Sequence, residues 1–517
     1  MANEPTTATS TDEDRGSFAH RRVFILAAIG SAVGLGNIWR FPYVAYENGG
    51  GSFIVPYLVA LLVAGLPFLL LDYGIGHRYR GSAPLSFRRL GGRAAETLGW
   101  WQVGICAVIA VYYAVIIAWA LRYTFFSFNK AWGDDPDGFF FAEFLQVTEE
   151  PGVSLDIVPG VLWPLVLVWL AVVVIMVAGV QKGIGTTAVI FIPLLIVAFL
   201  ILVVRAVFLP GAGAGLEALF EPDWSALTDA GVWAAAFGQI FFSLSVGFGI
   251  MITYASYVGK RTDMTGSGLV VGLANSSFEV LAGIGIFAAL GFLAQAQGVA
   301  VEEVAASGLG LAFVGFPAII NEAPAGALIG ILFFASLMVA GLTSLVSVIE
   351  VVISAVRDKL DLRRSTAALV VCGPAALVSI VFFATTTGVP ILDTADHFIN
   401  RFGILFVAVV SMVTVCWVYR DIDNLRAHLN QYGSVKLGTW WIAMVGVITP
   451  AVLTYVLIDE FRAVLDEPYG GYPGWLINSV GWGAVIGVIV LAVVLAQLPW
   501  RPGTALSIDD TKKEVTR

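Results

Sequence analysis

The chain has 517 residues, of which 58% are hydrophobic and 13% are charged, and its mean hydropathy is +0.86. Soluble domains carry about 25% charged residues, so this composition excludes a soluble globular protein and indicates a polytopic membrane protein. The formal net charge of −9 fits either a salt-adapted exterior or ordinary acidic loops.

Two polar segments border the hydrophobic part of the chain. Residues 1–20 are acidic and contain no apolar stretch of their own, so we expect a cytoplasmic tail and not a cleaved signal peptide. Residues 501–517 are expected to form a second cytoplasmic tail. Residues 21–500 between them are expected to form one all-α transmembrane domain.

The hydrophobic part predicts twelve membrane-spanning helices, because about twenty apolar residues cross a bilayer. Several of the apolar stretches are longer than that, so we expect tilted or broken helices. The twelve spans are expected at residues 22–46, 52–76, 98–128, 160–180, 186–207, 229–258, 267–296, 326–356, 366–388, 394–419, 437–459 and 474–498.

The charged residues of the loops predict the orientation. Five arginines lie within residues 78–93, after the second span, whereas the loop 129–159 carries seven acidic residues and one lysine. By the positive-inside rule, both termini are expected in the cytoplasm. The semi-apolar loop 300–323 is then external, and we expect it to act as a lid.

The first span is interrupted within Ile29–Asn48. Gly34, Gly36 and Asn37 break its apolar pattern, and Arg40 follows while the segment should still be crossing lipid. Backbone groups freed at that depth must be paired, so such a break survives where it lines a cavity. This stretch therefore predicts half of a binding site for a small solute and its coupling ion.

The sixth span has a matching interruption at Gly247 and Gly249. Because the sixth span begins five spans after the first, it crosses the membrane in the opposite direction. Matching breaks in two oppositely oriented spans are typical of transporters built from inverted repeats. We therefore expect repeats over 21–207 and 229–419, with helices eleven and twelve (437–498) appended. On the glycines alone, chance symmetry is an equally good explanation, since glycine is common in membrane helices.

An unwound helix offers carbonyl oxygens to a cation and free N–H groups to an anion. The side-chain oxygen of Asn37 suits a hard ion such as Na⁺. Ala340, Thr343 and Ser344 share one face of the eighth span. They predict a surface that faces the broken helices, although packing of small residues is the alternative.

Three ionisable residues within the spans need an explanation. Glu279 shares a face of the seventh span with Asn275, and an intramembrane carboxylate is costly and by default functional, with a structural ion pair as the alternative. Arg40 needs a partner. The pair Asp393 and Asp396 opens the tenth span on the same external side, which predicts an external Arg–Asp gate.

Five motifs follow one another along the chain, at Gly30–Tyr57, Phe237–Gly249, Ile252–Val258, Ala340–Ser344 and the Asp393/Asp396 pair. In sequence and order they resemble the motifs of the neurotransmitter:sodium symporters, also called the sodium:neurotransmitter symporter family, and the resemblance covers residues 15–500. The resemblance is closest to the prokaryotic amino-acid transporters and implies a LeuT-like fold of twelve helices, with a 5+5 inverted repeat and broken helices 1 and 6.

The resemblance implies two sodium sites. The first would use the carbonyl groups of Gly30, Val33 and Ala340 and the hydroxyl groups of Thr343 and Ser344. The second would use the Ala32 carbonyl, Asn37, Ser243, Asn275 and the carboxylate of the substrate itself. A ligand shared in this way makes the affinities for sodium and substrate mutually dependent.

The resemblance also implies a substrate site of apolar character and moderate size, which suits a hydrophobic α-amino acid. Tyr113 would bind the substrate carboxylate. Gly34 stands where monoamine members carry an Asp, so an amino acid is favoured over an amine. The implied substrate residues are Ala32, Gly34, Gly36, Ile109, Tyr113, Phe242, Ser243, Ser245, Phe248, Ser344 and Val348.

Chloride and the gates follow from the same resemblance. Glu279 stands where chloride-dependent members carry a Ser, so its carboxylate is expected to replace the anion and also to take up a proton on the return step. Outside, Arg40 and Asp396 would form the gate below the lid, with Phe248 capping the substrate. The inner gate would use Arg15 and Asp358 near Tyr257, although Phe18 replaces the Trp usual in the family.

The expected function is sodium-coupled uptake of an α-amino acid across the plasma membrane by alternating access. The sequence shows no ATP-binding or nucleophile motif, so we expect no enzyme activity, no organic cofactor and no nucleic-acid partner. One alternative is a membrane sensor that binds an amino acid without moving it, although a sensor needs no second gate. A channel is the other, although it would require rings of pore charges.

Overall fold

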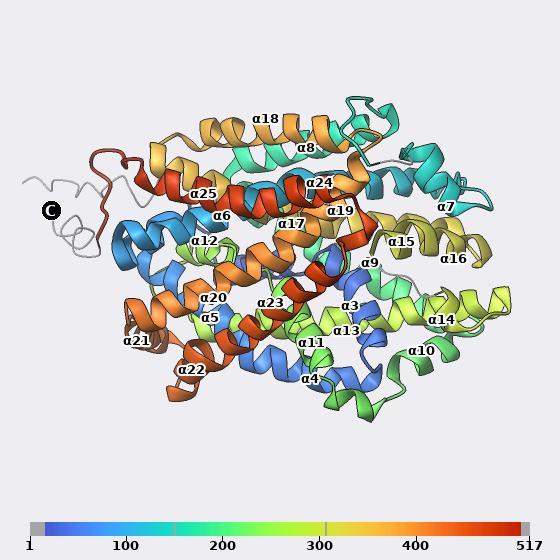
Figure 1. Cartoon of the computed structure of the whole chain (residues 1–517), viewed down its shortest axis with the longest axis horizontal. Coiled ribbons are helices and arrows are strands. Elements are labelled where there is room, and N and C mark those ends of the chain that lie inside the picture. The colour runs from blue at the N-terminus through green and yellow to red at the C-terminus, as the bar shows by residue number, and fades with distance from the viewer. Residues whose placement is uncertain (1–15, 149–150, 305–307, 508–517) are drawn as a thin grey trace, which may run out of the picture.

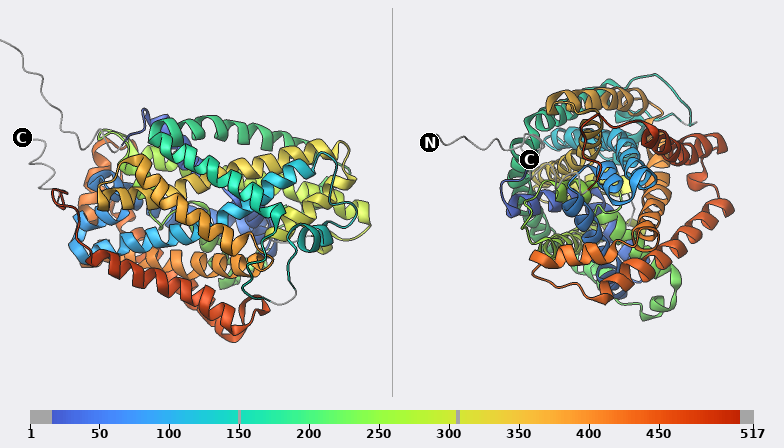
Figure 2. Two further views of the ribbon diagram at one scale, coloured as in Figure 1. Left: turned by 90° about the horizontal axis from the view of Figure 1, so that it is seen from above. Right: turned by 90° about the vertical axis from the view of Figure 1, so that its left-hand side faces the viewer.

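The computed structural model describes residues 16–148, 151–304 and 308–507. Within these residues the chain is almost entirely helical, with two isolated β-bridges as the exceptions. The helices form one elongated bundle, and most of them run along its long axis (Figures 1 and 2). Arg15, expected at the inner gate, lies outside the described residues.

Nine helical segments of the described chain are long and apolar enough to cross a membrane. Three of these segments coincide with the long elements α6 (Ala83–Phe126), α13 (Met264–Gln297) and α17 (Gly326–Leu360). The others are Gly51–Tyr79 with α4 (Ile54–Ala60) and α5 (Leu66–Tyr79), Pro159–Val207, α18 (Arg364–Phe383), Gly388–Val418 with α19 (Gly388–Phe398) and α20 (Leu405–Val413), Thr439–Gly471 with α22 (Thr439–Ala443) and α23 (Thr449–Asp466), and Gly474–Gln497 with α24 (Gly474–Leu476) and α25 (Gly483–Gln497).

The longest segment, Pro159–Val207, makes two crossings. Gly179 breaks it with a φ of 95°, and a Cβ on Gly183 would lie 1.9 Å from the carbonyl oxygen of Ile175. Such proximity is impossible in a continuous helix, so the chain turns back. It forms α8 (Pro159–Gly179) and α9 (Thr186–Val207), as the predicted fourth and fifth spans require.

Two further crossings are each made of half-helices. The first consists of α2 (Arg21–Ala32) and α3 (Leu35–Glu47), and the sixth consists of α11 (Ala230–Ser243) and α12 (Ile250–Ser256). Every residue of α12 is buried, so this half-helix lies inside the bundle and not at its rim. The twelve predicted crossings and the breaks in helices 1 and 6 are confirmed.

Two predicted boundaries were wrong. The tenth crossing begins at Gly388, six residues before the expected 394, because the connecting turn is short. Asp393 and Asp396 therefore lie within α19 and do not open it. The third crossing begins after Gly92, before the expected residue 98, because α6 consists of two helices that are joined where Gly91 (φ −144°) and Gly92 (φ 75°) leave the helical conformation.

The loop 300–323 is mostly helical where it is described. It contains α14 (Val301–Val304), α15 (Gly308–Gly310), the π-helical segment Leu311–Gly315 and α16 (Phe316–Glu322). Phe313 stacks on Phe140, with ring centroids 5.1 Å apart. This aromatic contact holds the loop on the end of the bundle that we call the loop side.

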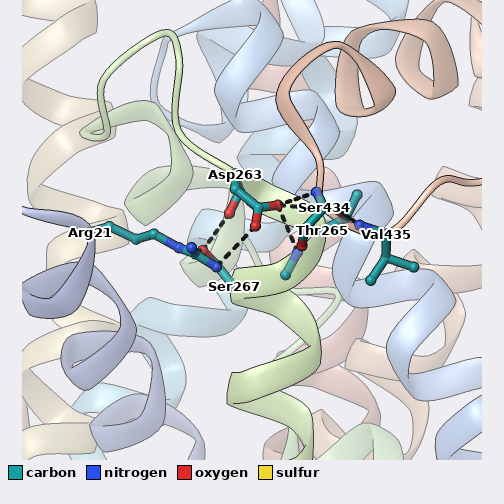
Figure 3. A network of polar contacts seen from close by, with 7 residues as sticks. Arg21, Asp263, Thr265, Ser267, Ser434 and Val435 are labelled. Atoms are coloured by element: carbon teal, nitrogen blue, oxygen red, sulfur yellow. Dashed lines mark hydrogen bonds and ion pairs between the residues drawn. The ribbon is translucent and has the colours of Figure 1, made fainter.

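The opposite end, the termini side, carries the first and last described residues. There, Arg21 at the start of α2 contacts Asp263, the N-cap of α13, at 3.2 Å. Asp263 also accepts hydrogen bonds from the amides of Gly266 (2.9 Å) and Ser434 (3.0 Å). One carboxylate thus joins two helices and the loop before α22 (Figure 3).

The pKa of Asp263 is lowered in this network. Burial alone would raise the pKa, but the hydrogen bonds from Gly266 and Ser434, together with the charge of Arg21, outweigh it. A carboxyl group with a lowered pKa stabilises the fold above its unfolded-state pKa. That contribution is lost as the pH falls through the lowered value.

We predict that Asp263→Ala lowers the free energy of unfolding by about 1 kcal/mol, because an N-cap acceptor is lost. Asp263→Asn keeps the acceptor and should cost less, since an exposed ion pair is worth under about 1 kcal/mol. Thermal unfolding of the detergent-solubilised protein measures the order. The difference between wild type and Asp263→Ala should shrink in acid, and a difference that does not change with pH would contradict this account.

Candidate functional site

The first break leaves two backbone amides without helical partners, and side chains pair both. Gly34 has an extended backbone (φ −126°, ψ −164°), and its N–H donates to the Asn37 Oδ1 at 2.9 Å. The N–H of Leu35 donates to the Tyr113 hydroxyl of α6 at 3.2 Å. The predicted break is therefore present, and it is held open by specific hydrogen bonds.

The second break runs from Leu244 to Gly249. Ser245, Gly247 and Gly249 have φ values of 53°, 87° and 88°, which is the left-handed region that favours glycine. The freed N–H of Gly247 donates to Asp72 Oδ2 of α5 at 3.1 Å. The two glycines are thus required by the backbone conformation.

One backbone carbonyl joins the two breaks. The carbonyl oxygen of Ser31, in the last turn of α2, accepts hydrogen bonds from the hydroxyls of Ser245 and Ser344, each at 2.9 Å. The second break and α17 thus meet at the end of α2. Sequence analysis missed Ser31, because its backbone does the work and no side-chain pattern reports it.

A chain of polar side chains connects three helices beside the breaks. Asn37 Nδ2 of α3 donates to Asn275 Oδ1 of α13 at 2.9 Å, and Asn275 Nδ2 donates to Ser243 Oγ of α11 at 3.1 Å. The carboxamide oxygens of Asn37 and Asn275 accept hydrogen bonds from the Gly34 amide and from Asn37 Nδ2, respectively, and each has a second lone pair. Oxygens of this type suit a hard cation.

A second group of oxygens lies between α2 and α17. Gly30 packs against Thr343, since a Cβ on this glycine would lie 3.4 Å from the Thr343 Cβ. Thr343 Oγ1 donates to the Ala340 carbonyl at 2.9 Å, and Val33 caps the C-terminal end of α2. The negative end of the α2 dipole favours a cation here, and the five-ligand site remains a prediction.

Glu279 is fully buried, and its hydrogen-bond partners are neutral groups, with Arg40 as the basic residue whose charge acts on it from beyond ion-pair distance. It accepts hydrogen bonds from Gln239 Nε2 at 2.7 Å and from the Tyr57 hydroxyl, and Ser243 is a further polar neighbour. Within the described part of the chain, no basic side chain forms an ion pair with it. The structure thus gives no support to the alternative of a structural ion pair.

A cavity of about 570 Å³ adjoins both breaks. It also reaches Leu309 of the lid loop and, on the loop side, Glu47, Asp459 and Tyr469, so it opens toward the loop side. All eleven predicted substrate residues line it, namely Ala32, Gly34, Gly36, Ile109, Tyr113, Phe242, Ser243, Ser245, Phe248, Ser344 and Val348.

Arg40 and Asp396, the predicted outer gate, both line this cavity. The guanidinium of Arg40 lies over the Phe242 ring at 4.4 Å, and Asp396 accepts a hydrogen bond from Asn400 at 2.8 Å. Among the described residues, these two form no ion pair with each other. The arrangement is that of an open path on the loop side, and the gate itself remains a prediction.

The termini side is closed below the cavity. Tyr257 donates to Glu350 Oε1 at 2.5 Å, and Arg364 of α18 makes two hydrogen bonds to the same carboxylate, each at 2.6 Å. Phe18 packs edge-on against Tyr254, with ring centroids 5.5 Å apart. Phe18, which stands in place of the Trp usual in the family, thus makes an aromatic contact on this side.

Asp358 was predicted to form the inner gate with Arg15, which lies outside the described residues. In the structure, Asp358 accepts a hydrogen bond from the Ser82 amide at 2.9 Å.

The sequence analysis did not identify some residues near the cavity and the termini side. Arg364 was missed, because its contact with Glu350 crosses the turn between two helices and has no helical spacing. The cavity residues His397, Arg401 and Tyr469 were also missed, since their position depends on how α19 and the loop after α23 pack.

The comparisons with known proteins agree with this geometry. The sequence profile of the Sodium:neurotransmitter symporter family matches residues 15–137 and 133–501. An uncharacterised sodium-dependent transporter of Methanocaldococcus jannaschii is 40% identical over 93% of this chain and 97% of its own. The human sodium- and chloride-dependent neutral and basic amino acid transporter B(0+) is 30% identical over 94% of this chain and 86% of its own.

A solved structure extends the likeness to three dimensions. The crystal structure of MhsT in complex with L-phenylalanine superposes with a TM-score of 0.73 and 33% sequence identity, covering 86% of this chain and 99% of that one. The expected LeuT-like fold is thereby confirmed. Because the family profile and these relatives span nearly the whole sequence, the chain belongs to the sodium:neurotransmitter symporter family.

Proposed function

We propose that the protein moves an α-amino acid into the cell together with Na⁺, without chloride, by alternating access in the plasma membrane. Membership of the family and the sodium dependence of the relatives described above support sodium-coupled transport. The observation that carries the proposal is the Asn37–Asn275–Ser243 chain. Its carboxamide and hydroxyl oxygens are of the type that suits a hard cation, and Asn37 and Ser243 line the cavity that adjoins both helix breaks.

The amino-acid carboxylate would bind at the start of α3, where the Tyr113 hydroxyl and the helix N-terminus both favour an anion. A Cβ on Gly34 would lie 3.1 Å from the Tyr113 hydroxyl and 3.3 Å from Ser344 Oγ. A larger residue would therefore fill this space, and an acidic one would also repel the substrate. This supports an amino acid over an amine.

Gly36 serves the same site by a different contact. A Cβ there would lie 2.1 Å from Cε1 of Phe242, so the glycine lets the aromatic ring approach the backbone of α3. Ile109, Phe248 and Val348 add apolar surface to the cavity. An apolar wall around a carboxylate-binding end favours a hydrophobic amino acid.

Two sodium ions are proposed. One would bind where the Ala32 carbonyl, Asn37, Ser243 and Asn275 meet the substrate carboxylate. The other would bind between the end of α2 and α17, at the carbonyls of Gly30, Val33 and Ala340 and the hydroxyls of Thr343 and Ser344. Because the first ion and the substrate would share a carboxylate, each would raise the affinity for the other.

Transport requires the two ends of the cavity to open in turn. In this structure the cavity opens to the loop side, while Phe18 and the Tyr257–Glu350 contact close the termini side. We propose that the loop side is extracellular and that both termini are cytoplasmic. Rocking of the repeats 21–207 and 229–419 would then bring Arg40 to Asp396 and separate Asp358 from Arg15.

Uptake of a radiolabelled hydrophobic amino acid into proteoliposomes tests the proposal. We expect accumulation when an inward Na⁺ gradient is imposed and none when K⁺ replaces Na⁺ outside. Gly34→Asp should abolish uptake, because the new carboxylate would occupy the space of the substrate carboxylate and repel its negative charge. Empty liposomes are the control, and binding without Na⁺-driven accumulation would contradict transport and favour a sensor.

The carboxylate of Glu279 generates a separate prediction. Uptake by the wild-type protein should be unchanged when gluconate replaces chloride. Glu279→Ser removes the fixed negative charge, so uptake by this variant should fall at least about ten-fold in gluconate and recover in chloride, in line with the loss of one charged hydrogen-bonding partner. A wild-type protein that requires chloride would overturn the proposed role of Glu279.

A further inference from the structure

A polar groove lies on the termini side, away from the central cavity. It has a volume of about 430 Å³ and is formed between the end of α5 and α21 (Ile422–Tyr432). Its lining consists of Arg78, Asn424, Ala427, His428, Asn430 and Gln431. None of these residues lines the central cavity.

One face of α21 supplies most of this lining. Asn424, His428 and Gln431 are spaced by four and then three residues, so they lie along one helical face. Arg78, in the last turn of α5, lies across the groove from them. The groove therefore combines a guanidinium, an imidazole and carboxamides, all of which can donate hydrogen bonds.

The guanidinium of Arg78 is not neutralised. Its Nε is buried and has no hydrogen-bond partner, and within the described chain no carboxylate forms an ion pair with it. The nearby Asp421 already accepts hydrogen bonds from Tyr79 (2.6 Å) and Asn424 (2.8 Å). Arg78 is half-buried and contacts the side chain of Tyr79, so its positive charge is left without an acid and its buried Nε without an acceptor. An anion in the groove would supply both.

Two histidines extend the cluster. His77 Nε2 contacts the carbonyl oxygen of Gly259 at 2.9 Å, so this nitrogen must carry a proton. His77 Nδ1 lies 2.9 Å from His428 Nε2. When His77 is neutral, its Nδ1 has no proton, so it accepts a hydrogen bond that His428 Nε2 donates. His428 Nδ1 then remains available, and it becomes a donor when an anion favours the charged ring.

The environment of His428 shows the same excess of positive charge. Burial, followed by the effects of His77, Arg78 and Arg80, lowers the pKa of His428 to about 4. No acidic group appears among these causes. An anion in the groove would offset this repulsion.

The position of the groove indicates where such an anion comes from. The loop after α21 leads to Trp440, which is 45% exposed and begins the next crossing with α22. Exposed tryptophans at the ends of crossings lie at the level of lipid headgroups. The groove is therefore within reach of both membrane phosphates and phosphate in solution.

We propose that this groove binds a phosphate group, held by Arg78 and His428 and carried either by an anionic lipid or by a free phosphate. The bound phosphate supplies the acceptor that Arg78 Nε lacks and ties the end of α5 to α21. This site is distinct from that of the transported amino acid, since the two cavities share no residue.

Thermal unfolding of the full chain in an uncharged detergent tests the site. One arm titrates potassium phosphate against potassium chloride at constant ionic strength and constant Na⁺. The other adds phosphatidylglycerol or, for comparison, phosphatidylcholine. We expect phosphate or phosphatidylglycerol to raise the unfolding midpoint, and Arg78→Gln to raise the half-saturating concentration about ten-fold, as loss of a charged hydrogen bond implies.

Arg426→Gln is the matched control, because Arg426 lies on α21, the other helix of the groove, but does not line the groove and pairs with Asp423 at 2.9 Å. It should respond like the wild type. A response to phosphatidylglycerol alone identifies a lipid headgroup, and a response to both identifies phosphate itself as sufficient. If Arg78→Gln does not fold, His428→Gln replaces it, and a variant response equal to that of the wild type, or no response in either arm, overturns the site.

Discussion

The structure depends on the pairing of backbone groups that two broken helices release inside the bundle. An unpaired buried polar group costs about 1–3 kcal/mol, and water is scarce at membrane depth. Each break is therefore held by side chains from continuous helices. The Leu35 amide donates to the Tyr113 hydroxyl, and the Gly247 amide donates to Asp72. The carbonyl of Ser31 accepts a hydrogen bond from Ser344.

The same pairing groups explain why a binding site forms at this place. Asn37 holds the amide of Gly34 and also contacts Asn275, so one side chain stabilises the break and contributes to a candidate ion site. Because the helix ends converge here, the end of α2 favours a cation and the start of α3 favours an anion. The structural roles and the proposed ligand-binding roles thus fall on the same residues.

The asymmetry of the two ends follows from different kinds of contact. On the termini side, Glu350 receives hydrogen bonds from both Tyr257 and Arg364, and Asp263 joins α2, α13 and a loop (Figure 3). On the loop side, Arg40 rests on Phe242 instead of an acid. The structure is thus that of a cavity open at one end only.

Much of the fold was predictable because the signals were local. Apolar length gave the twelve crossings, and Gly247 and Gly249 marked a conformation that other residues rarely adopt. Asn37 and Asn275 were expected at one site, and they form a direct hydrogen bond. For such residues, the residue type and its depth in the membrane are enough to predict where they lie in the fold.

The remaining contacts depend on how distant helices pack. The bond from Arg364 to Glu350 and the pair His77–His428 join separate elements, so no periodicity reports them. Ser245 adopts a left-handed φ without being glycine, because the neighbouring helices impose it. Arg40 and Asp396, both in the described part of the chain, form no ion pair with each other in this structure, where the loop side is open, and a sequence does not say which state a structure will show.

The central claim is that Na⁺ and the substrate meet at the first break, where Asn37 lines the cavity and donates a hydrogen bond to Asn275. The most direct test is the dissociation constant of a hydrophobic amino acid for the purified protein, measured by equilibrium binding across Na⁺ concentrations, with K⁺ keeping the ionic strength constant. The account predicts that affinity rises with Na⁺ and that Asn275→Ala weakens this dependence. An affinity independent of Na⁺ would contradict it.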